Sequence, residues 1–83
     1  MKILYFAWLR EKIGVAEEEV SPPEEVETVG ALIDWLRARG PGYQAALCNP
    51  KLVRCAIDQE FAGADAKIMG AAEIALFPPV TGG

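Results

Sequence analysis

The sequence predicts a single α+β domain in which a mixed sheet packs on one main helix. Three observations point to this fold class. The chain has 83 residues, of which 52% are apolar, and this is enough for one modest core without metals or disulfides. Residues 28–39 have the periodicity of an amphipathic helix. Four other segments have the pattern of strands and give the order β-β-α-β-β.

The first elements follow from residues 2–8, KILYFAW, which predict a strand because β-branched and aromatic side chains dominate them. Both faces of this strand are apolar, which indicates a central strand or an outer face covered by a partner. LREKIG then predicts a short helical turn closed by Gly14. Residues 15–20, VAEEEV, predict a second, antiparallel strand with an acidic exposed side. SPPEE ends the pattern, because neither proline can donate to a sheet ladder.

The clearest helix starts after Thr28, whose hydroxyl is typical of an N-cap. Its apolar face is formed at i, i+3, i+4 and i+7 by Val29, Leu32, Ile33 and Leu36. Arg37 and Arg39 lie near the C-terminus of the helix, where a positive charge interacts favourably with the helix dipole. Gly40-Pro41 are predicted to end the helix. Trp35 lies beside the apolar stripe and is predicted to cover the edge of the core.

The second half contains two predicted strands. Residues 42–49 allow a second short helix, and residues 52–58, LVRCAID, predict a strand. A turn at residues 58–60 follows, and residues 62–70 are irregular with a turn at their end. Residues 73–77, EIALF, predict the last strand. The positions predicted to face inward are Val53, Cys55, Ile57, Ile74 and Leu76.

The composition argues against several classes of function. The net charge is −4 and the eight basic residues are scattered, whereas nucleic-acid binding needs clustered Lys and Arg. Histidine, the usual general base and the commonest metal ligand, is absent from the sequence. Cys48 and Cys55 do not form a CxxC motif and are predicted to be reduced thiols in or near the core, so no metal site is expected. No membrane span or signal peptide is predicted, so the expected location is the cytoplasm.

The chain ends in FPPVTGG, which predicts an extended tail at residues 78–83 behind a domain at residues 1–77. The two prolines restrict φ and favour the extended polyproline conformation, so the tail leaves the last strand stiffly. Gly82 and Gly83 lack a Cβ and fit a channel too narrow for side chains. The tail reaches about 20 Å at roughly 3.3 Å per residue.

Chemistry at the end of this tail requires activation, because the carboxylate of Gly83 is a poor electrophile. ATP can convert it to a mixed anhydride, and a sulfur nucleophile can then displace AMP and leave a thiocarboxylate. The sequence has no G-x-x-x-x-G-K-[ST] loop for ATP, so the activating enzyme is expected to be a separate protein. Gly-Gly alone is also typical of a merely flexible terminus. The complete motif behind a closing strand favours the reactive tail.

Four segments resemble one known family. KILYFAWLRE, TVGALIDWLRARG, AIDQEF and EIALFPPVTGG are similar to the small subunit of molybdopterin synthase, a family of sulfur carriers with the ubiquitin-like β-grasp fold. The resemblance covers nearly the whole chain and is most specific in the final motif. It is weakest over residues 41–51.

The resemblance implies a set of partners. A ubiquitin-activating-type adenylyltransferase uses ATP to adenylate Gly83, and a sulfurtransferase system converts the adenylate to a thiocarboxylate. The chain itself is expected to bind no cofactor. The tail then enters the large subunit of molybdopterin synthase, where two sulfurs are delivered to cyclic pyranopterin monophosphate in molybdenum cofactor biosynthesis. The active synthase of this family is a heterotetramer. The partner-binding residues of the tail are then Pro78, Pro79, Val80, Thr81 and Gly82.

The family's hydrophobic contact with its partners corresponds to Phe6, Phe61 and Phe77. The strand assignments agree for Phe6 and Phe77, which fall on the sheet face opposite the helix, and Phe61 follows the predicted turn. Each phenylalanine alone is more typical of core packing, whereas three on one exposed patch would need a partner. The acidic residues between Glu17 and Glu27 are predicted to form a solvated edge outside the site.

Other interpretations stay open. A sulfur carrier for thiamine synthesis or for tRNA thiolation also ends in Gly-Gly, and the Pro-Pro before Val-Thr-Gly-Gly favours the molybdopterin branch. A non-reactive ubiquitin-like interaction module would use the tail only for docking. A self-sufficient enzyme is disfavoured because the sequence lacks a histidine, a metal-ligand cluster and a phosphate loop.

Overall fold

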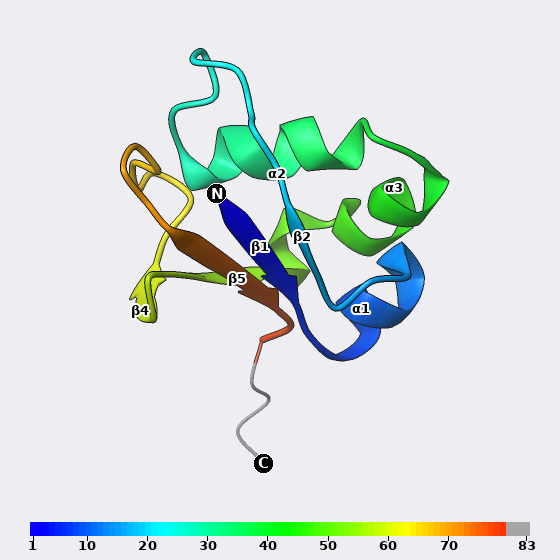
Figure 1. Ribbon diagram of the computed structural model, residues 1–83. Coiled ribbons are helices and arrows are strands. Elements are labelled where there is room, and N and C mark those ends of the chain that lie inside the picture. Colours follow the sequence, from blue (N-terminus) through cyan, green and yellow to red (C-terminus); the bar gives the residue numbers. More distant parts are fainter. Residues whose placement is uncertain (80–83) are drawn as a thin grey trace.

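The computed structural model describes residues 1–79, apart from the side chain of Pro50, and has an α+β fold with a five-stranded mixed sheet. The elements in chain order are β1 (Lys2–Tyr5), α1 (Ala7–Ile13), β2 (Glu17–Glu19), α2 (Val29–Arg37), α3 (Pro41–Leu47), the 3-10 turn η1 (Pro50–Leu52), β3 (Arg54–Ile57), β4 (Glu60–Ala62) and β5 (Glu73–Phe77). The strand order is β2-β1-β5-β3-β4, in which β1 and β5 are parallel and the other neighbours are antiparallel. Figure 1 shows α2 across one face of the sheet, with α1 and α3 together at one side. The predicted fold class is confirmed.

The hydrophobic core lies between α2 and the sheet. All four residues of the predicted helix stripe, Val29, Leu32, Ile33 and Leu36, are buried. The sheet contributes alternate positions of β1, β3 and β5 to the same core, namely Ile3, Tyr5, Cys55, Ile74 and Leu76. Val53 is also buried, and Ile57 packs against the core from a partly buried position. The inward positions predicted from the two periodicities are therefore confirmed.

The ends of α2 show which boundary signals are reliable. Thr28 is the N-cap, as predicted, and its Oγ1 accepts a hydrogen bond from the Ala31 N–H at 3.2 Å. The helix ends at Arg37, earlier than the predicted stop at Gly40-Pro41. The proline instead occupies the first turn of α3, where its missing N–H costs nothing. It therefore marks the start of the second short helix, which the sequence allowed.

The prediction of a strand over residues 2–8 is wrong at its end, because β1 stops before Phe6 and Ala7–Trp8 belong to α1. The Phe6 carbonyl accepts a hydrogen bond from the Leu9 N–H at 3.1 Å, and Leu9 enters the core. A short apolar run suits both a strand and a buried helix, and alternation alone does not separate them. The helical turn itself is confirmed, and it closes at Gly14 with a φ of 97°.

β3 and β4 form a hairpin whose second strand the sequence did not predict. The predicted turn is confirmed for Asp58 and Gln59, with φ of 47° and 75°, but Glu60 already belongs to β4. Two residues with positive φ give a tight turn whose twist matches that of a hairpin. The Asp58 carboxylate accepts hydrogen bonds from the N–H groups of Ala72 and Glu73, at 3.1 and 2.9 Å. The turn is thereby attached to the start of β5.

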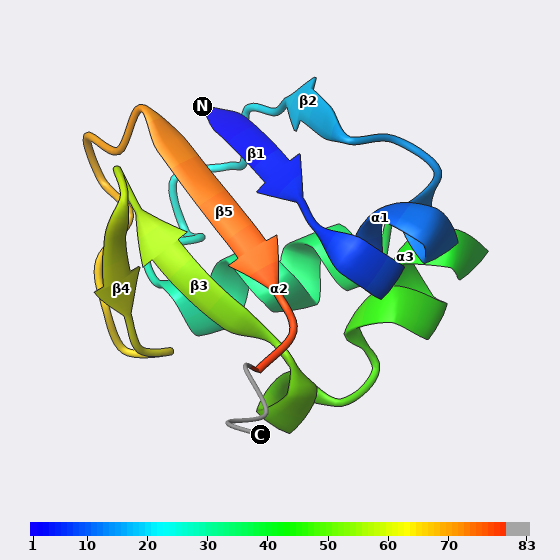
Figure 2. The same cartoon turned by 90° about the horizontal axis from the view of Figure 1, so that it is seen from below.

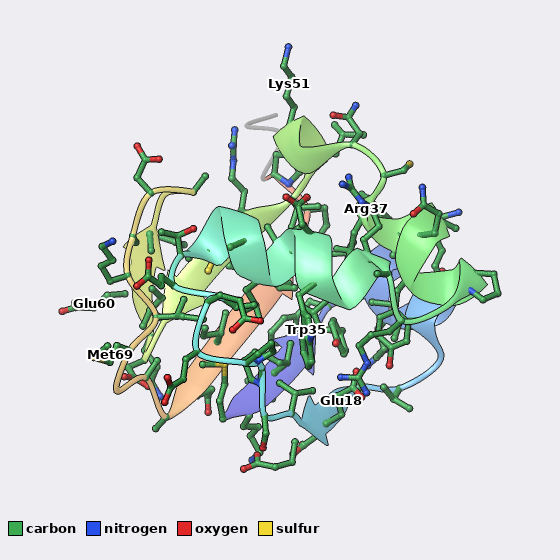
Figure 3. The ribbon with its side chains drawn as sticks, turned by 90° about the horizontal axis from the view of Figure 1, so that it is seen from above. Glu18, Trp35, Arg37, Lys51, Glu60 and Met69 are labelled. Atoms are coloured by element: carbon green, nitrogen blue, oxygen red, sulfur yellow. The ribbon has the colours of Figure 1, made fainter. Side chains whose placement is uncertain are left out.

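Glu18 departs from the predicted solvated acidic edge. The glutamates on either side of it in β2 are exposed, but the side chain of Glu18 is only 18% exposed. Its carboxylate accepts hydrogen bonds from the hydroxyls of Tyr5 and Tyr43, each at 2.7 Å, and Arg39 approaches it at 3.4 Å. The Arg39 guanidinium also lies over the ring of Trp35. Trp35, labelled in Figure 3, packs at the edge of the core as predicted. The carboxylate therefore connects β1, β2 and α3 with the segment that follows α2.

Candidate functional site

The candidate site lies at the end of β5, where the predicted tail begins. β5 is hydrogen-bonded to β1 on one side and to β3 on the other. Figure 2 looks onto the sheet face opposite α2 and shows β5 running to the end of the molecule where the chain leaves the sheet. Ile74 and Leu76 are buried under α2, so Ala75 and Phe77 lie on the opposite side, as predicted.

The sheet face opposite α2 carries two rows of mainly apolar side chains. In the first row the strand register aligns Leu4, Ala75, Ala56 and Phe61 across β1, β5, β3 and β4. The exposed Glu17 of the edge strand β2 stands beside Leu4 at the end of this row. In the second row Phe77 stands opposite Arg54. We call the six residues other than Glu17 the open face. Phe61 is 86% exposed, unlike a phenylalanine that serves a core.

The structure brings two of the three predicted contact phenylalanines together. The ring centroids of Phe61 and Phe77 are 5.8 Å apart, with their planes inclined by 56°. Phe6 is 47% exposed, but it lies beyond the end of β1, and it joins no aromatic pair among residues 1–79. Its N–H donates to the Leu76 carbonyl at 3.1 Å, so it stays at the same end of β5 as Phe77. The role of all three in partner binding stays a prediction.

Arg54 is a candidate that the sequence reasoning missed. It is the first residue of β3, and its side chain is exposed. Together with Phe61 and Phe77 it lines a shallow hollow of about 330 Å³. The only signal in the sequence is its place between the inward positions Val53 and Cys55, which turns it outward on the strand.

The predicted tail is described only at its start. Pro78 and Pro79 follow β5 directly and are partly buried. The other predicted tail residues lie outside the described part of the chain: Val80, Thr81, Gly82 and Gly83. Their roles, and the boundary between a domain at residues 1–77 and a tail at residues 78–83, stay predictions.

Few groups in the described part have the chemistry of a catalyst. Residues 1–79 contain no cluster of three or more His, Cys, Asp or Glu that could hold a metal ion. Cys55 is buried, and burial raises the pKa of its thiol to about 11, so it is protonated at neutral pH. Cys48 is exposed, and neither cysteine is in a disulfide, as predicted. In the same part of the chain no helix has the length and apolar character needed to cross a membrane.

A larger hollow lies at the opposite end of the sheet. This groove of about 820 Å³ is lined by Met1, which precedes β1, and by residues of the loop before α2 and the loop before β5, among them Pro22, Val26, Lys67 and Met69. Met69 is 91% exposed, and Figure 3 shows it at the periphery of the molecule. We call this hollow the far-end groove. The whole length of β5 separates it from Phe77, so it is not part of the candidate site.

The chain is similar to known proteins over nearly its whole length. A family model described as the ThiS family matches residues 3–83. Over 83 residues the chain is 36% identical to the molybdopterin synthase sulfur carrier subunit of Escherichia coli (strain K12), with 100% of this chain and 99% of the relative covered. It is 35% identical, with the same coverage, to the molybdopterin synthase sulfur carrier subunit of Haemophilus influenzae.

Solved structures share the fold. SAMP1 from Haloferax volcanii superposes with a TM-score of 0.72 at 28% sequence identity, covering 100% of this chain and 98% of that chain. Molybdopterin converting factor, subunit 1, from Pyrococcus furiosus gives a TM-score of 0.75 at 26% identity, covering 95% of each chain. The ubiquitin-like β-grasp fold implied by the resemblance is confirmed.

Proposed function

Because this chain belongs to the ThiS family, we propose that it is the sulfur carrier subunit of a molybdopterin synthase. The observation that carries this proposal is the full-length match to two such subunits, at 36% and 35% identity, with 99% of each relative covered. The chain works with the large subunit of the synthase. It brings sulfur to the enzyme for molybdenum cofactor biosynthesis.

The sulfur is carried at Gly83. In this proposal the Gly83 carboxylate attacks ATP within a ubiquitin-activating-type adenylyltransferase, which releases pyrophosphate and leaves an acyl adenylate. A sulfurtransferase system supplies the nucleophile that displaces AMP, so the chain end becomes a thiocarboxylate. Two such ends supply the two sulfurs that cyclic pyranopterin monophosphate receives. The absence of histidine from the sequence supports this division of labour, because the usual general base is missing.

The tail reaches the large subunit because the open face docks against it. Phe61 is 86% exposed and is paired with Phe77 at a centroid distance of 5.8 Å. An exposed aromatic pair beside an apolar row is typical of an interface. Phe6, half exposed at the same end of the sheet, extends this contact. Pro78 and Pro79 then direct Val80, Thr81 and Gly82 away from the strand and into the partner.

Intact-mass spectrometry of the chain purified from its native host tests the chemistry. We expect a fraction in which one oxygen is replaced by sulfur, and fragmentation should localise the exchange to Gly83. A variant with one alanine added after Gly83 loses the exchange and all synthase activity, because the reactive carboxylate is displaced. Met69→Ala, in the far-end groove, is the matched control and keeps both. An extended variant that is as active as the wild type would show that the tail only docks.

A reconstituted reaction separates this function from the related carriers. Thiocarboxylated chain and large subunit should convert cyclic pyranopterin monophosphate to molybdopterin. If the thiocarboxylate instead supports thiamine synthesis or tRNA thiolation, and no large subunit accepts it, the chain is a carrier of another branch. The same assay shows whether the assembled complex is a sulfurtransferase, and the mass of that complex shows whether it is a heterotetramer.

A further inference from the structure

Arg54 is the residue of the open face that the proposed function does not use. It stands opposite Phe77, the last residue of β5, in the antiparallel register of β3 and β5. It also shares the lining of the 330 Å³ hollow with Phe61 and Phe77. A cation therefore lies beside the aromatic pair, at the end of the sheet from which Pro78 continues.

Arg54 has no acidic partner in the described part of the chain. Arg37 pairs with Asp34 at 2.8 Å, and Arg39 pairs with Glu18 at 3.4 Å. Among residues 1–79 no carboxylate oxygen lies within 4.0 Å of the Arg54 guanidinium. Within this part of the chain the Arg54 side chain is exposed and its positive charge has no counter-charge.

The other charges on this side of the sheet lie away from the tail. Lys2 and Glu73 stand opposite each other at the start of β1 and β5. Lys2 also pairs with Glu17 of the edge strand β2 at 3.1 Å. The edge strand β2 adds Glu17 to the first row beside Leu4, at the side of the sheet away from Phe61. Arg54 is the one cation in the two rows, and its sign is opposite to the net charge of −4 on the chain.

A partner that covers the open face must accommodate this charge. A guanidinium removed from water without a counter-charge is costly, whereas a carboxylate satisfies it through two parallel hydrogen bonds. The apolar first row and the phenylalanine pair require an apolar surface. The complementary partner surface therefore combines an apolar patch with a carboxylate at its margin.

We propose that a carboxylate of the large subunit of molybdopterin synthase binds Arg54 and sets the register of docking. This inference rests on the proposed function, which supplies the large subunit as the partner. The phenylalanine pair and the ion pair form two separate points of attachment, so together they fix the direction in which β5 points. Arg54 is a positioning residue, because it acts through docking and does not contact the reacting atoms.

Calorimetric titration of the full chain into the large subunit tests this inference. Arg54→Gln removes the charge and keeps a polar side chain, and we expect it to raise Kd about tenfold in a low-salt buffer. Arg54→Glu places a like charge against the carboxylate and should raise Kd about a hundredfold. Lys67→Glu is the matched control, since it changes the net charge as much as Arg54→Glu does but lies in the far-end groove. Its Kd should stay within about twofold of the wild type.

Two further measurements identify a direct ion pair. The difference between the wild type and Arg54→Gln should shrink at about 0.5 M sodium chloride, because salt screens charge pairs. Among Asp and Glu substitutions in the large subunit, one should weaken binding of the wild type but not of Arg54→Gln. The inference is overturned if Arg54→Gln binds within about twofold of the wild type at low salt, or if Lys67→Glu is weakened as much as Arg54→Glu. Failure of the wild type itself to bind would overturn the proposed function, so the two failures are distinguishable.

Discussion

Replacing Glu18 with alanine tests whether one carboxylate joins the helices to the sheet. One oxygen of Glu18 accepts hydrogen bonds from the hydroxyls of Tyr5 and Tyr43 at 2.7 Å, and the other oxygen is 3.4 Å from Arg39. Tyr5 is only 1% exposed, so water has little access to its hydroxyl when the carboxylate is removed. Glu18→Ala should therefore lower the free energy of unfolding well beyond the effect of an exposed charge.

The size of the loss follows from these contacts. A hydrogen bond to a charged group contributes about 1.5–3 kcal/mol, and the buried hydroxyl of Tyr5 belongs at the upper end of this range. Tyr43 is partly exposed, so water replaces some of its bond, and the Arg39 pair adds at most about 1 kcal/mol. We expect a total loss of about 3–4 kcal/mol, which corresponds to a fall in Tm of roughly 12–32 °C for a domain of this size.

Urea unfolding followed by tryptophan fluorescence and circular dichroism measures this loss. Glu17→Ala is the matched control, because Glu17 lies on the same strand and its pair with Lys2 is exposed on both sides, so it should cost at most about 1 kcal/mol. In a double-mutant cycle with Tyr5→Phe, we expect a coupling energy above about 1 kcal/mol. Equal losses for Glu18→Ala and Glu17→Ala, or a coupling near zero, would refute the reasoning.

Three further outcomes are expected. Burial and the hydrogen bond to Glu18 raise the pKa of Tyr5. Above about pH 10 the Tyr5 hydroxyl therefore loses its proton in the unfolded chain but keeps it in the folded one. The free energy of unfolding should then fall as pH rises, by up to about 1.4 kcal/mol per pH unit. Alkaline denaturation should show a smaller slope for Tyr5→Phe, and an unchanged slope would contradict this cause. Phe61→Ala should weaken large-subunit binding about 10-fold to 100-fold in calorimetry with little change in Tm. Met69 is similarly exposed, and Met69→Ala should leave the affinity unchanged. Equal losses of affinity in the two variants would show that the open face is not the interface. At neutral pH a disulfide reagent should modify the thiol of Cys48 rapidly and that of Cys55 slowly. A rapid reaction that persists in Cys48→Ser would contradict this, because it would show that Cys55 is accessible.

The sequence predicts α2 and β5 well because each has one strong periodicity and one buried side. The same reasoning fails at Ala7–Trp8, where an apolar run leaves the sheet and still returns Leu9 to the core. β4 has only three residues, too few to show an alternation. Three successive glutamates in β2 look alike in the sequence. Only the register of β2 on β1, which pairs Glu18 with the buried Ile3, separates Glu18 from its neighbours.

The candidate site was predictable in its residue types but not in its contacts. FPPVTGG and the phenylalanines indicate a tail and an exposed patch. The contact of Phe61 with Phe77 depends on two registers, β4 on β3 and β3 on β5, and no local pattern specifies them. Arg54 was missed for the same reason, because a single outward arginine on a strand is typical of any solvated surface. Its significance comes only from the two phenylalanines beside it.

The central place of β5 has a mechanical consequence. A force that draws the chain end outward acts along β5, which is held by hydrogen bonds to β1 on one side and to β3 on the other. Such a force loads both ladders in shear, so many bonds must yield together, whereas an edge strand such as β2 can be peeled away bond by bond. A pull on the proposed tail would thus load a strand that is held on both sides.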